Sequence, residues 1–223
     1  MKNAKTLLAI TLTLVMVFSF CACSFELGGE ETWEYTSDDK EGTVQLFNDF
    51  FEETYKNTNQ IVTAKSNGQD YFVETIDGTS DYTKYSTNGA EAWSFIKDGE
   101  YISAVSGEDS SYYMVSEEYY GYAYFAYKNS FNIVEMLPEE GLTYSCESKG
   151  SAKDGKSNAT LTLEIKSDER NITINASAKD GLVETVNISS TQEGTTVNTT
   201  MTIVYGSASV TVPDISGWDK QDV

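Results

Sequence analysis

The sequence contains no histidine, and this absence removes the commonest tools of enzyme chemistry. Histidine is the most frequent general base and a frequent zinc ligand, so Ser–His and Cys–His catalytic pairs are excluded. Paired carboxylates remain, as at Glu117-Glu118 and Glu139-Glu140, but adjacent charges in a turn usually serve only solvation. The sequence also lacks a phosphate-binding glycine loop and a calcium-binding loop. We therefore predict that the protein is not an enzyme and needs neither cofactor nor metal.

Cysteine is also scarce: the chain has three, and Cys21 and Cys23 both lie near its N-terminus. Cys146 is the one further thiol, so an intradomain disulfide and a disulfide-stapled scaffold are excluded. Because Cys146 lies in a segment with the pattern of a strand, we predict a buried structural cysteine and not a reactive one.

Basic residues are few, with 15 Lys and Arg against 35 Asp and Glu and a net charge of −20. Phosphate binding needs clustered Lys and Arg, so nucleic acid is not an expected partner. The same charge repels anionic lipid headgroups, and contact with a membrane has to come from a lipid anchor. We interpret the acidity as a source of solubility and self-repulsion, and we expect a monomer.

The N-terminus has the features of an export signal. Lys2 and Lys5 precede an uncharged, mostly apolar run over residues 7–20. This run is too short to span a membrane and is typical of the apolar region of a secretory signal. Residues 1–22 are therefore the predicted signal peptide.

The stretch Phe20-Cys21-Ala22-Cys23 follows the apolar run. It resembles the lipobox of bacterial lipoproteins, in which a small residue precedes the cysteine that is acylated. Ala22 before Cys23 fits this pattern better than Phe20 before Cys21, so Cys23 is the predicted lipid attachment site. The resemblance implies a diacylglyceryl anchor with palmitate-type chains and a place on the extracytoplasmic face of the cell membrane, in a bacterium of the Gram-positive type. An ordinary cleaved signal and free secretion are the alternative.

The rest of the chain divides into a tether, one domain and a short tail. Residues 23–42 are acidic with little apolar content, and we predict a flexible tether. Residues 43–215 form the predicted single domain, and residues 216–223 a C-terminal tail. The domain opens with a predicted helix over residues 43–56, with Thr43 as its N-cap. Its apolar stripe has helical spacing and contains Val44, Phe47, Phe51 and Tyr55.

Four short turn signals predict the layout of the next stretch: Asn67-Gly68, Asp77-Gly78, Asn88-Gly89 and Asp98-Gly99. Such pairs favour type I′ turns, which join antiparallel strands. They predict strands near residues 60–66, 70–76, 81–86, 92–97, 101–105 and 112–116. Several of these strands carry apolar residues on both faces, so we expect the second face to be partly covered, by a helix or by the curvature of the sheet.

A tyrosine-rich stretch interrupts this rhythm at residues 112–137, and residues 122–137 are either a helix or partly a loop. Strands resume near residues 143–147, and the Asp154-Gly155 and Asp180-Gly181 pairs are further hairpin signals. The later strands are predicted at residues 159–166, 171–176, 182–189, 196–205 and 207–212. Asn-x-Ser/Thr triplets along them are interpreted as residues of the solvated face; they begin at Asn158, Asn171, Asn175, Asn187 and Asn198.

The predicted fold is mainly β, of the α+β class, with about eleven antiparallel strands curved into a half-barrel around one or two helices. The order of elements over residues 43–215 resembles that of the LolA-like lipoproteins, which include mycobacterial lipid-binding lipoproteins. This order is a helix, hairpin-linked strands, a helical insertion, more strands and a closing Val-Pro-Asp. This resemblance implies a cavity between the curved sheet and the helices that holds a lipid or another hydrophobic ligand. The candidate cavity residues are Phe47, Phe51, Trp93, Phe95, Phe125, Phe131, Val134, Leu137, Met201 and Ile203.

Two alternatives have no hydrophobic ligand. The chain has 15 tyrosines, ten phenylalanines and three tryptophans, and aromatic side chains can fill a core, line a lipid cavity or stack on sugars. A cell-surface glycan-binding protein would expose a row of tyrosines, for which Tyr119, Tyr120 and Tyr122 are the candidates. A regulatory or assembly lipoprotein would need no small-molecule site.

Overall fold

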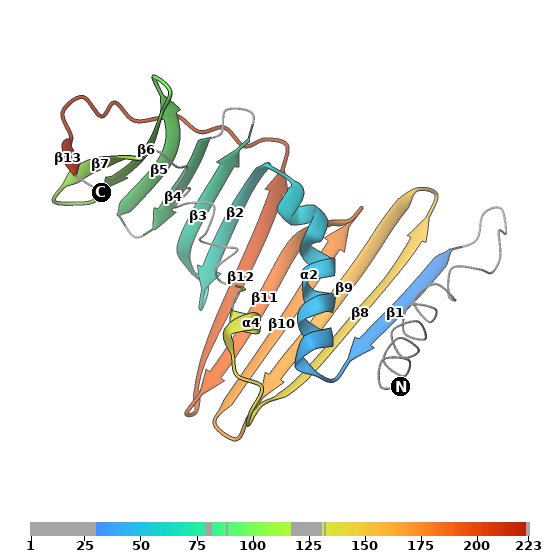
Figure 1. Cartoon of the computed structure of the whole chain (residues 1–223). Helices are drawn as coiled ribbons and strands as arrows, with labels where there is room; N and C mark the ends of the chain where they lie inside the picture. Colours follow the sequence, from blue (N-terminus) through green and yellow to red (C-terminus); the bar gives the residue numbers. More distant parts are fainter. Residues whose placement is uncertain (1–29, 79–81, 88, 117–130, 132, 222–223) are drawn as a thin grey trace, which may run out of the picture.

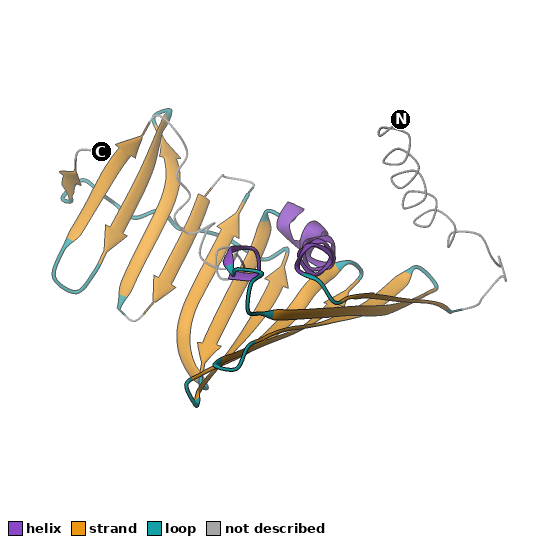
Figure 2. Ribbon diagram, turned by 60° about the horizontal axis from the view of Figure 1, so that its bottom comes forward, coloured by secondary structure: helices purple, strands orange, loops and turns teal. Residues whose placement is uncertain are grey.

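The computed structural model describes residues 30–78, 82–87, 89–116, 131 and 133–221. In this part the chain is mainly β, as predicted, and one large, open, curved sheet contains all thirteen described strands (Figures 1 and 2). The strands are β1 (Glu31–Ser37), β2 (Asn59–Ser66), β3 (Gln69–Asp77), β4 (Tyr82–Thr87), β5 (Ala90–Lys97), β6 (Glu100–Ser106), β7 (Ser111–Ser116), β8 (Thr143–Lys153), β9 (Lys156–Lys166), β10 (Arg170–Lys179), β11 (Leu182–Gln192), β12 (Thr195–Tyr205) and β13 (Asp219–Gln221). The described helices are α2 (Lys40–Lys56) and α4 (Ile133–Met136).

The strand order is β1-β8-β9-β10-β11-β12-β2-β3-β4-β5-β6-β7-β13. Two runs of successive hairpins, β2 to β7 and β8 to β12, are joined through the antiparallel β12–β2 pair. The neighbours are antiparallel except β13, which pairs with β7 in parallel. The edges of the described sheet are β1 and β13.

The turn signals gave most of the hairpins correctly. Asn67 and Asp98 have φ values of 48° and 55°, and the glycine after each is also at positive φ, as a type I′ turn requires. Asp77-Gly78 is different, because Asp77 still belongs to β3 and the Gly78 N–H donates to the carbonyl of Thr58 at 2.7 Å. A glycine is required at position 78 because the Thr58 side chain lies so close that a Cβ would be 2.3 Å from it. Asn88 lies outside the described residues.

The structure differs from the prediction at two domain boundaries and at one strand. The predicted tether, residues 23–42, contains β1, which pairs with β8 along its whole length and lays Trp33 over Gly150. The predicted tail contains β13. The strand predicted at residues 207–212 does not form, because this segment leaves the sheet after β12 and crosses to β13 (Figure 1).

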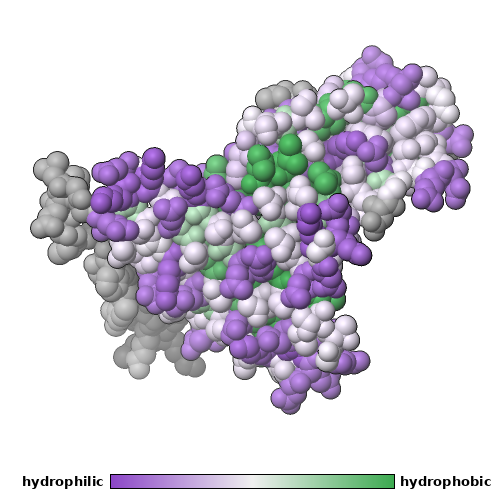
Figure 3. Space-filling view, turned by 180° about the vertical axis from the view of Figure 1, so that it is seen from behind, coloured by the Kyte–Doolittle hydropathy of each residue, from purple (hydrophilic) through white to green (hydrophobic). Residues whose placement is uncertain are grey.

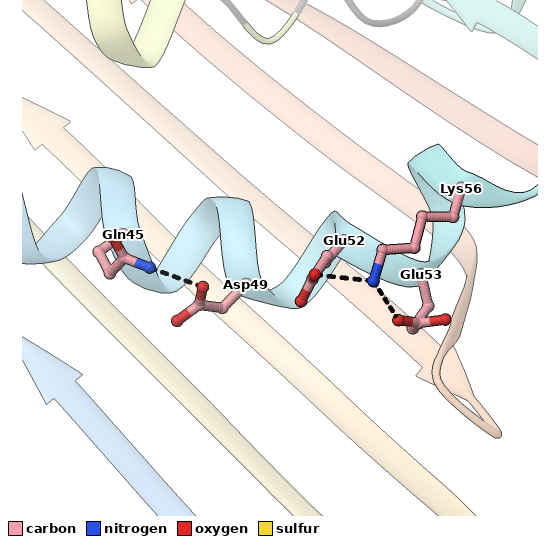
Figure 4. Close-up of polar contacts among 5 residues, drawn as sticks. All are labelled: Gln45, Asp49, Glu52, Glu53 and Lys56. Carbon is pink, nitrogen blue, oxygen red and sulfur yellow. Dashed lines mark hydrogen bonds and ion pairs between the residues drawn. The ribbon is translucent and has the colours of Figure 1, made fainter. Parts of the chain in front are cut away.

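Helix α2 begins three residues earlier than predicted. Its N-cap is Asp39, whose carboxylate accepts from the Gly42 N–H at 2.7 Å, and Thr43 is buried inside the helix. The outer side of α2 is polar (Figure 4): Gln45 donates to Asp49, and Lys56 pairs with Glu52 and Glu53. The ammonium of Lys56 in the last turn offsets the two carboxylates near the negative end of the helix dipole.

We call the side of the sheet on which α2 lies the front face, and the other side the back face. On the front face α2 runs across β1, β8, β9 and β11, and its buried stripe packs into the main core cluster. On the back face, strands β9 to β12 carry Thr, Asn and Ser, and Figure 3 shows purple and near-white atoms over this face with green patches among them. Asn175 and Asn187 are exposed in this array and accept hydrogen bonds from Thr162 and Thr200. All five Asn-x-Ser/Thr asparagines are exposed, which confirms that they belong to the solvated face.

A second core cluster lies on the back face of β5 and β6. Trp93 and Phe95 share this face, as predicted from their alternation, and they pack with Ile102 and Ala104. Residues 206–218, which we call the C-terminal strap, cover them with Val210, Ile215 and Trp218. The cover of the second face is therefore an extended segment, and not the helix or the sheet curvature that was expected.

Candidate functional site

The space between the helices and the front face is where a ligand cavity was predicted. Of the ten candidate residues, seven lie together in the main core cluster: Phe47, Phe51, Phe131, Val134, Leu137, Met201 and Ile203. Each has 9% or less of its surface exposed, so these side chains fill the space between α2 and the sheet instead of lining an open one. Trp93 and Phe95 do not belong to this site, because they lie on the back face. Phe125 lies outside the described residues.

Helix α2 contributes the centre of the cluster. Phe51 is fully buried, and its ring centroid lies 4.7 Å from that of Phe47, 5.0 Å from that of Phe131 and 5.6 Å from that of Tyr55. The C-terminal end of α2 is fixed by a buried network in which the Val183 N–H donates to Thr54 and the Tyr205 hydroxyl donates to the Val183 carbonyl. Burial raises the pKa of Tyr205 to about 12, so its hydroxyl stays protonated and keeps donating even at alkaline pH, where an exposed tyrosine loses its proton.

The other side of the cluster comes from a much shorter element. It consists of α4 with the flanking residues Phe131, Leu137 and Pro138, and we call it the α4 segment. Phe131, Val134 and Leu137 are buried, while Met136 points away and is 81% exposed. Lys40 of α2 donates to the Leu137 carbonyl at 2.7 Å, and Asn48 of α2 donates to Glu135 at 3.2 Å. Tyr144 of β8 donates to the Pro138 carbonyl at 2.9 Å. Tyr144 also donates to the Leu137 carbonyl at 3.3 Å. This short segment is therefore held by four side-chain hydrogen bonds and by the apolar contacts of its buried residues.

A surface groove of about 620 Å³ lies between the first turn of α2 and α4. Four carboxylates line it, from Asp39, Glu41, Glu135 and Glu139. Lys40 is the cation of this lining, and its ammonium is the donor to Leu137. The groove is therefore acidic, and it adjoins the segment that closes the apolar core.

The remaining chemistry of the described residues is limited. Cys146 is buried in β8, and desolvation raises the pKa of its thiol to about 11, so the nucleophilic thiolate is scarce at neutral pH. In the described part of the chain, no three His, Cys, Asp or Glu residues gather as metal ligands would. No described helix is long and apolar enough to cross a membrane. Residues 1–29, with the predicted attachment site Cys23, lie outside the described residues.

One surface feature was missed. Tyr71 and Val73 share the back face of β3, as their alternation predicts, but neither is covered, and a second groove lies around them. The signal was present in the sequence as apolar residues on both faces of one strand. This pattern was interpreted only as evidence that the second face of the sheet is covered.

Comparison with models of known protein families and with curated proteins found no match for this chain.

Proposed function

We propose that this protein is a membrane-anchored extracytoplasmic lipoprotein that binds a lipid or another hydrophobic ligand between its curved sheet and its helices. The observation that carries the proposal is the way the apolar core is closed. Phe131, Val134 and Leu137 enter it from one short segment, whereas α2 has 17 residues and its C-terminal end is hydrogen-bonded to β11. In this proposal the sheet is a half-barrel of the LolA-like kind, and the α4 segment is its removable closure.

Displacement of the α4 segment by an acyl chain exchanges one set of apolar contacts for another. The three buried side chains and an acyl chain offer the same kind of apolar surface, so the core loses little contact when one replaces the other. Three of the hydrogen bonds that hold the segment join exposed or partly buried groups, which water can satisfy after release, and the fourth, from Tyr144 to the Leu137 carbonyl, is buried. An entering ligand therefore has to offset the burial of Phe131, Val134 and Leu137, of which Phe131 has the largest apolar side chain.

The acidic groove beside α4 restricts which charge the headgroup of such a ligand can carry. Its carboxylates outnumber its one ammonium, so a phosphate or carboxylate headgroup is repelled and a neutral hydroxylated headgroup is accepted. We therefore expect monoolein to compete for the site better than oleate or phosphatidylglycerol.

The Phe131→Ala variant tests the proposal. Wild-type protein and variant are titrated with N-phenyl-1-naphthylamine, a neutral fluorescent probe, and then with monoolein as competitor. Because the variant no longer has to expel a phenyl ring, we expect its Kd for the probe to be lower by about tenfold, which corresponds to roughly 1.4 kcal/mol. Native mass spectrometry and organic extraction of the purified wild-type protein identify a ligand that is bound already.

Phe95→Ala is the matched control, because it removes an equally buried phenyl ring from the back-face cluster. It destabilises the fold in a similar way but leaves the α4 closure intact, so its affinity for the probe should stay at the wild-type value. Equal affinities of the two variants for the probe, with circular dichroism showing both folded, would contradict the proposed site.

The anchor is tested separately with Cys23→Ala. Loss of the acylated cysteine should move nearly all of the protein from the membrane fraction to the medium, measured by immunoblot of fractionated cells. Cys21→Ala is the control and should leave the protein on the membrane. A Cys23→Ala protein that stays in the membrane fraction would show that the predicted attachment site is wrong.

A further inference from the structure

The groove around Tyr71, which we call the Tyr71 groove, has a volume of about 400 Å³. The residues used below are Asp70, Tyr71, Val73, Ser86, Glu91 and Ser106. Val73, Ser86, Glu91 and Ser106 are successive cross-strand neighbours on the back face of β3, β4, β5 and β6. The groove is therefore built on four adjacent strands, and it lies on the opposite face from α2.

A β-bulge aims Tyr71 into this groove. The β2–β3 register passes from Ala64 opposite Phe72 to Lys65 opposite Asp70, which leaves Tyr71 without a partner on β2. Bulges of this kind re-aim a side chain and are common beside binding sites. Thr87 of β4 donates to the Tyr71 carbonyl at 2.6 Å, so the bulged backbone is fixed on its other side.

The Tyr71 ring is held in place and yet open to solvent. It meets Phe72 edge to face, with ring centroids 5.5 Å apart, and Phe72 is anchored in the main core. Even so, 48% of Tyr71 is exposed, as is 37% of Val73. A fixed, exposed aromatic ring is a ready surface for the apolar face of a ligand.

Polar groups surround this ring. The hydroxyl of Ser86 donates to Glu91 at 3.4 Å, and the hydroxyls of Ser106 and Ser111 are 2.9 Å apart. Glu91 pairs with Lys84 at 2.5 Å, and Asp70 pairs with Lys65 at 3.3 Å. Because each carboxylate has a lysine beside it, the groove offers hydrogen-bond acceptors with little local net charge.

We propose that the Tyr71 groove binds a neutral saccharide. A pyranose ring has an apolar face of C–H groups, which stacks on a tyrosine, and a rim of hydroxyls, which donate to carboxylates and exchange hydrogen bonds with serines. A cationic ligand is disfavoured because Lys84 and Lys65 already neutralise the carboxylates. An anionic sugar is repelled by the strongly acidic protein. This activity is separate from the proposed lipid site and does not depend on it.

The test uses the purified full chain and three neutral probes: cellotriose, maltotriose and the trimer of N-acetylglucosamine. Saturation-transfer NMR detects binding, and calorimetry measures Kd, for which we expect a value on the order of 1 mM for at least one probe. Tyr71→Ala should weaken that binding at least tenfold, whereas Tyr71→Phe keeps the ring and should stay within about threefold.

Tyr35→Ala is the matched control, because Tyr35 is 57% exposed and lies on β1, far along the sheet from β3. It should bind the saccharide as the wild-type protein does. The proposal is overturned if none of the three probes binds, if Tyr71→Ala binds as well as the wild type, or if Tyr35→Ala loses the same affinity. Binding of trilysine in preference to all three saccharides would also overturn it, because the groove would then select a cation.

Discussion

Replacing Phe51 by alanine is expected to lower the free energy of unfolding by about 3–5 kcal/mol, the range for truncating a fully buried phenylalanine. Phe51 has no exposed surface and contacts the rings of Phe47, Tyr55 and Phe131, so its removal leaves a void bounded by both helices. Helix α2 and the α4 segment meet at this point, where the ring centroid of Phe51 lies 5.0 Å from that of Phe131. Urea unfolding followed by circular dichroism measures the loss.

The neighbouring Phe50→Ala is the control for Phe51→Ala. Phe50 is on the same helix and only partly buried, with its ring centroid 5.8 Å from that of Phe51. Its truncation should cost about 1 kcal/mol, because less apolar surface is lost and water can fill the space. Equal losses for the two variants would show that Phe51 is not the centre of the main core.

Replacing Ile215 by aspartate is expected to release the C-terminal strap. Ile215 is buried in the back-face cluster against apolar neighbours, and an unpaired carboxylate in such a place costs about 3 kcal/mol or more. The strap is a thin peripheral segment, so it should detach before the sheet unfolds. We expect a red shift of tryptophan emission, because Trp93 and Trp218 lose their contact at 5.9 Å, and faster proteolysis after residue 206.

Ser209→Asp is the control for the strap. Ser209 is exposed between the buried Ala208 and Val210, so the same charge is added to the same segment without being buried. Its emission spectrum and proteolysis pattern should match the wild type. If Ile215→Asp also matches the wild type, the strap does not depend on the back-face cluster for its place.

The central sheet was the most predictable part of the fold because its signals are local. Asn-Gly and Asp-Gly pairs fix positive φ at hairpin turns, and alternation assigns the faces of each strand. β1 was missed although Trp33 and Tyr35 alternate with Thr32, Glu34 and Thr36. Its acidic composition suggested a tether. Its pairing partner β8 lies more than a hundred residues away in sequence, and composition carries no information about such a partner.

The candidate site was predictable in composition but not in arrangement. Apolar periodicity identified the buried residues of α2 and α4, and it identified Trp93 and Phe95 as sharing one face. Periodicity does not show on which face of the sheet the apolar side chains of a strand lie. The residues of the main cluster and of the back-face cluster were therefore assigned to one predicted cavity. Tyr71 was placed on the correct face, but the β-bulge that exposes it depends on the register with β2, which no local signal reveals.

The strand order has a consequence for how the chain reaches its native state. Helix α2 is made early, but it packs on β1, β8, β9 and β11, and β8 begins roughly 90 residues after α2 ends. The aromatic stripe of α2 thus leaves the ribosome long before the strands that cover it. β2 likewise has to wait for β12, at the far end of the sheet-forming sequence. Native packing of α2 and pairing of β2 with β12 therefore have to wait until most of the chain has been made.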